Sequence, residues 1–265
     1  MIIHGGGFHK GDLFEQGQEQ ASAWLQSRGY FVVSITHRLA PCGHITGQDP
    51  TDPASGRPPN QTNDVKSAIR AVRADAHCNG HIGLLGGSSG ASHALFCAFD
   101  KTPSPPNTYP NWCNDSPTDD DRPDCAVGLS GNYDFIAPPP GNNDTTRNVI
   151  ANYTNTCVLL DTMGGPDQFS VSPVAQLKPE SVQIFKPIYA LNGNAEYQPE
   201  GQLQDLLCAL QAKDIDPAKY KILTVIDPEG AHAFALWRVK LTPTADRRVR
   251  DEVTDFFDQY VKHAQ

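Results

Sequence analysis

The sequence lacks a long hydrophobic run, an excess of basic residues and a close pair of cysteines. No apolar stretch approaches the roughly 18 residues that cross a bilayer, so we expect no membrane partner. The 21 Lys and Arg residues are outnumbered by 30 Asp and Glu residues, which gives a formal net charge of −9. This charge disfavours nucleic acids and anionic membranes and favours a small neutral or cationic substrate.

The seven cysteines are scattered without a C-x-x-C pair, which argues against a structural zinc site. Their odd number leaves at least one thiol free if disulfides form. The pair most worth testing is Cys113 and Cys125, which flank a loop rich in Pro and Asp. The first residues show neither the basic nor the apolar region of a signal peptide, so the sequence predicts a cytoplasmic protein.

A length of 265 residues suits one domain, 1–265, with a substantial core. Apolar, β-branched runs alternate with segments of helical spacing, which is typical of a parallel sheet covered by helices on both faces. The sequence therefore predicts an α/β fold with a mostly parallel sheet of about six strands. The predicted strands are residues 1–3, 30–36, 82–85, 126–129, 184–191 and 222–226, and the predicted helices include 65–72, 91–99, 203–210 and 246–260.

Two stretches interrupt this alternation. Residues 101–124 are rich in Pro, Asn and Asp and predict a long surface loop, in which the acidic run 119–121 is expected to be solvated rather than to bind a cation. Residues 135–180 begin with three prolines near 138–140 and carry only weak periodicity. We expect this second stretch to form a partial lid over an active site.

The strongest motif is the G-x-S-x-G sequence at residues 86–90, with Ser88 at its centre. It follows an apolar run and precedes a helical segment, which is the strand–turn–helix context of a nucleophilic serine. Small neighbours suit a tight turn, and the dipole at the start of the helix favours negative charge beside Ser88. The alternative is an ordinary Gly/Ser loop. The context favours Ser88 as a nucleophile.

A second glycine motif, HGGGF at residues 4–8, follows the apolar start of the chain. Consecutive glycines allow backbone N–H groups to approach a substrate oxygen. We predict an oxyanion hole formed by the N–H groups of Gly6, Gly7 and Ser89. A phosphate-binding loop is the alternative, but the G-x-x-x-x-G-K-[ST] and G-x-G-x-x-G patterns are both absent.

HGGGF, then HRLAP at 37–41, then GGSSG resemble in order the HGGG, YRLAP and G-x-S-x-G motifs of hormone-sensitive-lipase-like carboxylesterases in the α/β-hydrolase superfamily. SGNYD at 130–134 resembles the SG-x-YD of feruloyl- and acetyl-esterase-like enzymes and kynurenine formamidases. The resemblance covers nearly the whole chain. It implies an α/β-hydrolase fold and acyl transfer through a serine, with no metal or organic cofactor.

The resemblance also implies a catalytic histidine in a loop after the last strand. His232, in GAHAF at 230–234, resembles the G-H-x-F of the relatives and is the predicted general base. An ordinary loop histidine is the alternative. His4 belongs to the glycine motif, and we expect it to brace the backbone there rather than to transfer protons.

The third member of the triad should be a carboxylate after the strand 184–191. Aligned on Gly193, Glu196 matches the aspartate of the relatives' G-x-x-D pattern, but aligned on A-E-Y-D-P the acid position is Gln198. Glu196 is preferred because a carboxylate there can orient the histidine and stabilise the imidazolium. Glu200 and Asp205 are the other candidates.

One departure concerns the start of the chain. In the relatives HGGG lies many tens of residues along, after two or three strands, whereas here it begins at residue 4. Either the chain is truncated or the fold is a smaller version. Both possibilities predict the absence of the usual N-terminal edge strands, an open sheet edge beside residues 1–3, and possible self-association through that edge.

Together these features predict a serine hydrolase that cleaves a small ester with a short acyl chain through an acyl-enzyme. An aryl formamide or another amide is an alternative substrate of the same fold. A hydrolase-fold protein that binds a small molecule without turnover is the alternative from another functional class.

Overall fold

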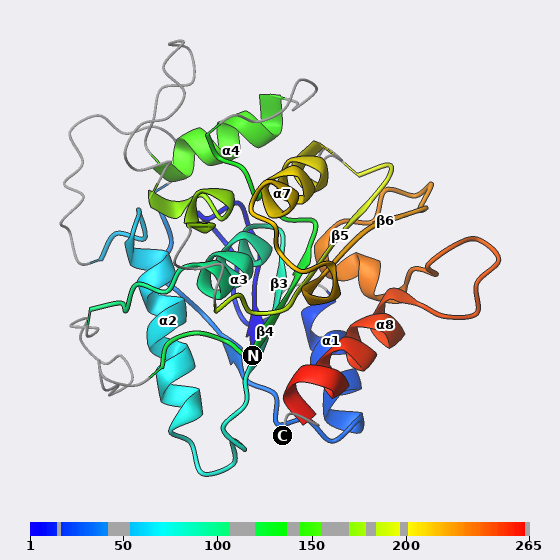
Figure 1. Cartoon of the computed structure of the whole chain (residues 1–265), viewed down its shortest axis with the longest axis horizontal. Coiled ribbons are helices and arrows are strands. Elements are labelled where there is room, and N and C mark those ends of the chain that lie inside the picture. Colours follow the sequence, from blue (N-terminus) through cyan, green and yellow to red (C-terminus); the bar gives the residue numbers. More distant parts are fainter. Residues whose placement is uncertain are drawn as a thin grey trace.

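The computed structural model describes residues 1–14, 17–41, 54–105, 120–136, 144–154, 170–178, 184–196 and 201–262. Within these ranges one sheet of six strands has the order β2-β1-β3-β4-β5-β6, and every neighbouring pair is parallel (Figure 1). The predicted α/β fold with a mostly parallel sheet is confirmed. The strands are β1 Ile2–Ile3, β2 Ser34–Ile35, β3 Gly83–Gly87, β4 Cys125–Leu129, β5 Ile188–Gly193 and β6 Tyr220–Val225.

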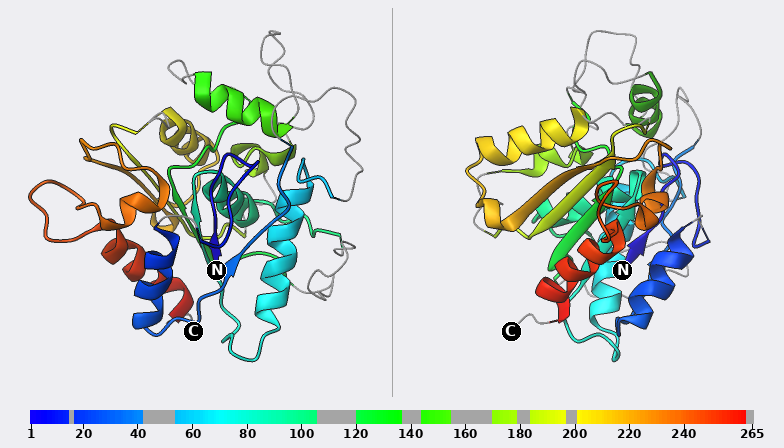
Figure 2. Two further views of the ribbon diagram at one scale, coloured as in Figure 1. Left: turned by 180° about the vertical axis from the view of Figure 1, so that it is seen from behind. Right: turned by 90° about the vertical axis from the view of Figure 1, so that its right-hand side faces the viewer.

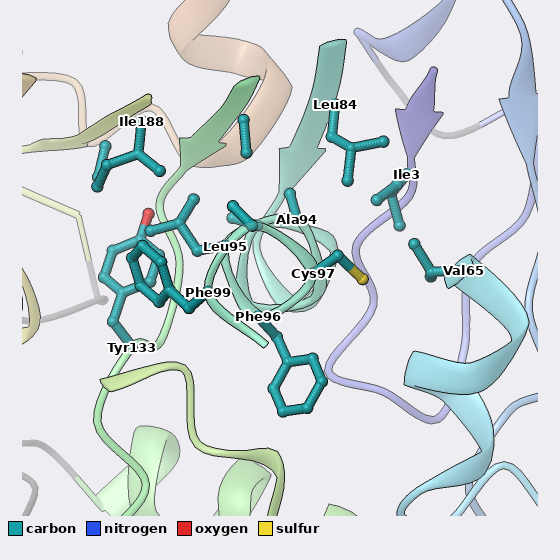
Figure 3. Packing of buried hydrophobic residues seen from close by; sticks show 14 of the residues in the cluster. Ile3, Val65, Leu84, Ala94, Leu95, Phe96, Cys97, Phe99, Tyr133 and Ile188 are labelled. Carbon is teal, nitrogen blue, oxygen red and sulfur yellow. The ribbon is translucent and has the colours of Figure 1, made fainter. Parts of the chain in front are cut away.

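Both faces of the sheet are buried because successive side chains point to opposite faces. Leu84 and Ala126 belong to one hydrophobic cluster, whereas their neighbours Leu85 and Val127 belong to the other. Figure 3 shows the first cluster packed around α3. Its helices are α2 Asn60–Arg73, α3 Ser89–Phe99, α4 Asp144–Thr154 and α7 Gly201–Ala212, and those of the second cluster are α1 Gln18–Ser27 and α8 Val249–Phe257.

Helices α1 and α8 lie side by side on the second face, in blue and red in Figure 1 and in the left view of Figure 2. The indole N–H of Trp24 donates to the Thr254 hydroxyl at 3.0 Å, and the Tyr30 hydroxyl donates to Asp258 at 2.7 Å. A short 3-10 helix, Ala233–Arg238, adds Trp237 and its neighbours to the same cluster. No helix in the described ranges combines the length and the apolar character needed to span a membrane.

The predicted segments 65–72, 91–99 and 203–210 lie in α2, α3 and α7. The predicted segment 246–260 overlaps α8, which begins at Val249 and continues into a π-helix at Asp258–Lys262. Helix α1 was not predicted. Its buried residues are Gln18, Ala21 and Leu25, so its apolar stripe is narrow and contains a polar residue. Amphipathic periodicity is weak in such a helix, and packing against the sheet stabilises it instead.

Two strands begin four residues later than predicted. Residues 30–33 lie outside β2 because β1 is only two residues long and pairs Ile2 with Ser34 and Ile3 with Ile35. Residues 184–187 lie outside β5. Pro187 has no N–H to donate to a sheet, and the strand begins at the next residue.

The predicted open edge beside residues 1–3 was also wrong. Strand β1 lies inside the sheet, paired with β2 on one side and with β3 on the other. Among the described strands the edges are β2 and β6. The physical reason is that the chain returns through α1 and places residues 34–35 beside β1. These residues form β2, which pairs with the side of β1 that was predicted to be open.

Self-association stays a prediction, and it now concerns the β2 edge. Phe31 precedes β2 and leaves 49% of its surface exposed. We expect Phe31→Glu to shift the protein towards monomer in light scattering at matched concentrations, because a charge on an edge opposes pairing with another chain. Phe14→Glu is the matched control at another exposed phenylalanine, where no shift is expected. A monomeric wild type would contradict the prediction.

The acidic run 119–121 is not solvated throughout. Asp121 is only 4% exposed, and its carboxylate lies 3.0 Å from Arg70 and 3.9 Å from Lys66 of α2. Buried cations require a carboxylate partner, which explains why Asp121 is buried with them. Asp119 lies outside the described residues. Cys113 does as well, so the suggested disulfide with Cys125 falls outside the described part of the chain; Cys125 itself is buried.

Candidate active site

The candidate residues meet at the carboxyl ends of neighbouring strands. Ser88 follows β3, Glu196 follows β5, and His232 lies in the loop after β6. Parallel strands bring their carboxyl ends to one edge of the sheet, and ligands of open α/β sheets bind there. Residues more than a hundred positions apart in the sequence are therefore neighbours in the fold.

Ser88 sits in a tight turn between β3 and α3. Its backbone has φ 54° and ψ −123°, and its N–H donates to the carbonyl of Leu129 at 2.8 Å. A Cβ at Gly86 would lie 2.1 Å from the carbonyl oxygen of Gly90, so only glycine fits there. The first N–H groups of α3, including that of Ser89, have no acceptor within the helix. The partial positive charge of these N–H groups at the helix N-terminus would stabilise a negative charge beside Ser88.

His232 and Glu196 are in direct contact. Nδ1 of His232 lies 2.6 Å from Oε2 of Glu196, whose side chain is completely buried. When Nδ1 donates to the carboxylate, Nε2 is the ring nitrogen that carries the lone pair. The following residue, Ala233, has its Cβ 3.1 Å from the place that a Cβ on Gly87 would occupy. The histidine loop therefore packs directly against the turn that holds Ser88.

The other candidate acids do not take this position in the described part of the chain. Asp205 lies on α7, where burial and the nearby Asp134 carboxylate raise its pKa to about 6. Gln198 and Glu200 lie outside the described residues. Glu196 is the candidate carboxylate that the structure places against His232.

Hydrogen bonds within the HGGG loop hold the carbonyls of Gly5 and Gly6. Nδ1 of His4 donates to the carbonyl of Gly5 at 2.7 Å, and the N–H of Lys10 donates to the carbonyl of Gly6 at 3.2 Å. In a trans peptide the N–H points opposite to the carbonyl of the preceding residue. The N–H groups of Gly6 and Gly7 are thus turned away from these bonds, as an oxyanion hole requires.

Gly6 has φ 112°, and a Cβ there would lie 2.1 Å from the carbonyl oxygen of Lys10. We expect Gly6→Ala to lower kcat/KM for an ester by about 100-fold or more, because the clash displaces the loop with its N–H groups and loss of one oxyanion donor costs about that much. Gly29→Ala is the matched control, since Gly29 also has a positive φ but nothing lies within 4 Å of its Cβ position. It should lower the melting temperature and leave kcat/KM unchanged. Equal kinetic losses in both variants would show that backbone strain alone is responsible.

Three buried histidines pack together at the HGGG loop, and one of them, His4, belongs to the loop itself. The rings of His4 and His37 stack at 4.3 Å, and His93 meets His37 edge-on at 5.1 Å. Nε2 of His93 lies 2.9 Å from Oε1 of Gln61, whose amide donates to the carbonyl of Phe8 at 2.6 Å. Burial lowers the pKa of His37 to about 3 and holds the pKa of His93 well below its usual value. His37 and His93 are therefore neutral in the folded protein at pH 7.

This burial predicts acid sensitivity. The unfolded chain binds protons at His37 and His93 near the ordinary pKa of 6.5, whereas the folded protein does not. Their contribution is therefore intact above pH 6.5 and is lost as pH falls below that value, by up to about 1.4 kcal/mol per pH unit for each histidine. We expect His93→Gln to make the fall in unfolding free energy between pH 6 and pH 4 less steep, measured by urea titration. For His77→Gln, at an exposed histidine, the plot of unfolding free energy against pH should run parallel to that of wild type. A parallel plot for His93→Gln would contradict the account.

Helix α4, from the stretch predicted as a partial lid, packs on the HGGGF loop. The rings of Tyr153 and Phe8 stack at 4.1 Å. The Val149 side chain lies 3.7 Å from the place that a Cβ on Gly7 would occupy. Residues 137–143, 155–169 and 179–180 of the same stretch lie outside the described residues. Helix α4 therefore limits the space beside the glycine loop.

Two buried polar residues near the site were not predicted to have a role. Gln202 on α7 accepts the N–H groups of Tyr133 and Asp134 at 2.6 and 2.8 Å and thereby holds the SGNYD loop. Ser130, the first residue of that motif, hydrogen-bonds to Glu196. The SGNYD resemblance was the available signal for Ser130, which is part of that motif. Among the described residues no group of three His, Cys, Asp or Glu side chains is arranged to hold a metal ion.

Comparison with known proteins assigns the family. The BD-FAE family model matches residues 1–185. The chain belongs to the BD-FAE family. A comparison with curated protein sequences found no match. Membership makes this BD-FAE chain an esterase-type hydrolase with an α/β-hydrolase fold.

Solved structures share the fold of this BD-FAE chain. A truncated carbohydrate esterase from gut microbiota has a TM-score of 0.70 and 22% identity, over 98% of this chain and 85% of that one. An acetyl ester-xyloside bifunctional hydrolase from Caldicellulosiruptor lactoaceticus has a TM-score of 0.61 and 19% identity, over 98% and 81%. A thermophilic esterase from Thermogutta terrifontis has a TM-score of 0.60 and 16% identity, over 97% and 80%.

Proposed function

We propose that this chain is a serine hydrolase that cleaves carboxylic esters with short acyl chains through an acyl-enzyme. The observation that carries the proposal is the 2.6 Å contact between His232 and Glu196, on a loop packed against the turn of Ser88. A buried carboxylate bonded to Nδ1 of a histidine, beside a serine at a helix N-terminus, is the arrangement that nucleophilic acyl transfer requires.

In the proposed reaction Oγ of Ser88 attacks the ester carbonyl while Nε2 of His232 takes the hydroxyl proton. The negative charge that develops on the carbonyl oxygen is stabilised by the N–H groups of Gly6, Gly7 and Ser89. His232 then returns the proton to the leaving alcohol, and the acyl group remains on Ser88. Glu196 keeps the imidazole oriented and stabilises its protonated form.

Deacylation repeats these steps with water. His232 removes a proton from a water molecule, which attacks the acyl-serine carbonyl and passes through a second tetrahedral intermediate. Collapse of that intermediate releases the carboxylic acid, and the proton returns to Oγ of Ser88. No further reactant is needed.

An acetylated carbohydrate is the first natural substrate to test. The net charge of −9 suits a neutral sugar, and two of the similar structures are named as a carbohydrate esterase and an acetyl ester-xyloside hydrolase. α4 bounds the HGGGF loop closely through Val149 and Tyr153, which favours a small acyl group.

The proposal is tested with nitrophenyl acetate, butyrate and dodecanoate, acetylated xylose and an aryl formamide. We expect kcat/KM to be highest for acetate or butyrate and to fall steeply for dodecanoate. Faster cleavage of the formamide would replace the ester by an amide within the same mechanism. Saturable binding of all these compounds without turnover would contradict the proposal and favour a small-molecule binder.

A further inference from the structure

Ser130 joins the segments that carry the three candidate catalytic residues. It follows β4 directly, has no exposed surface and adopts φ 57°. Its N–H donates to the carbonyl of Leu191 in β5 at 2.8 Å. The carbonyl of the preceding residue, Leu129, accepts the N–H of Ser88 at 2.8 Å. The end of β4 is thus fixed both to the nucleophile turn and to the strand that leads to Glu196.

The hydroxyl group of Ser130 has a defined direction. The N–H of Ala233, next to His232, donates to Oγ at 2.8 Å, and Oγ lies 2.9 Å from Oε1 of Glu196. Because a backbone N–H can only donate, Oγ is the acceptor in the first bond. Its single hydrogen is then available for the carboxylate, which can only accept when ionised. Oγ of Ser130 therefore links the histidine loop, at Ala233, to the carboxylate of Glu196.

The two oxygens of Glu196 have separate partners. Oε1 receives the Ser130 hydroxyl and the N–H of Gly193, the latter at 2.6 Å, whereas Oε2 lies 2.6 Å from Nδ1 of His232. Two donors on Oε1 fix the plane of the carboxylate and leave Oε2 directed at the imidazole. Removal of the hydroxyl would free one side of Oε1 and leave the Ala233 N–H buried without an acceptor.

We propose that Ser130 is a positioning residue that holds Glu196 and His232 in the geometry needed for proton transfer. This inference rests on the proposed function of Ser88, His232 and Glu196. Ser130 does not touch the substrate and acts through its two neighbours. The serine of the SGNYD motif thereby acquires a role in the active site.

The kinetic test uses Ser130→Ala and Ser130→Gly. Both remove the hydroxyl, and glycine adopts φ 57° without strain, so a loss shared by both variants belongs to the hydroxyl. We expect kcat to fall by about 10- to 100-fold with KM unchanged, because small misplacements of catalytic groups have effects of this size. Ser172→Ala is the control. Ser172 is equally buried and accepts the N–H of Phe135 at 3.1 Å, so its loss should lower stability but not kcat.

A double-mutant cycle separates positioning from a general structural role. In a Glu196→Gln background, Ser130→Ala should cause no further loss of kcat, because its partner no longer presents the same carboxylate. Independent, multiplicative losses would overturn the proposal, as would wild-type kcat in both single variants. Neither of these results would contradict the proposed function, provided that the activity of the wild-type enzyme depends on Ser88.

A second readout does not depend on turnover. The Nδ1 proton of His232, bonded to Glu196, should give a downfield NMR resonance that disappears in His232→Gln. We expect Ser130→Ala to shift this resonance upfield or broaden it, and Ser172→Ala to leave it in place. An unchanged resonance in Ser130→Ala would overturn the proposal even if no ester substrate is found.

Discussion

Ser88→Ala is expected to lower kcat for a short-chain ester by about 10,000-fold or more, since loss of a catalytic serine has effects of this size in other hydrolases. The physical reason is that alanine cannot form the acyl-enzyme, and water must then attack the ester without covalent catalysis. Binding should survive, because the HGGG loop and α3 are unchanged. The measurement is initial-rate kinetics on nitrophenyl acetate, with KM compared between variants.

Ser89→Ala is the matched control for this experiment. Ser89 is buried like Ser88, with 1% against 7% of its surface exposed, and follows it at the start of α3, but only its backbone N–H is assigned to the oxyanion hole. Alanine keeps that N–H, so kcat should stay close to wild type. The assignment would be wrong if Ser88→Ala kept near-wild-type activity while Ser89→Ala lost it.

His232→Ala should produce a loss of similar size, because Oγ of Ser88 is a weak nucleophile without a base to take its proton. The double variant Ser88→Ala/His232→Ala should be no worse than either single variant, since residues that act as a unit are not additive. His77→Ala, at an exposed histidine, serves as the control and should keep full activity. Losses that multiply in the double variant would mean that the two residues act in separate steps.

The sequence was informative about the centre of the fold and less so about its periphery. Strand β4 is a continuous apolar run, and its position was predicted to within one residue. The extent of β2 was not predictable from its own residues, because a strand ends where its neighbour β1 ends. Helix α1 was missed because its buried stripe contains Gln18. Tertiary contacts decide such elements, and local patterns do not report them.

The candidate site shows the same division. Ser88 and the HGGG glycines are part of local motifs whose backbone requirements are visible in the sequence. Glu196 could not be separated from Gln198 by alignment, because the contact with His232 depends on how the loops after β5 and β6 approach each other. Ser130 carries its role through contacts with residues 66 and 103 positions away, which no spacing rule predicts.

The most direct test of the central claim is labelling with a fluorophosphonate, which reacts quickly only with an activated serine. The full chain is treated at neutral pH, digested and analysed by mass spectrometry, beside Ser88→Ala and His232→Ala. The account predicts one phosphonylated residue, Ser88, with no labelling of the Ser88→Ala variant and slow labelling of His232→Ala. A wild-type protein that stays unlabelled, or that is labelled at another serine, would contradict it.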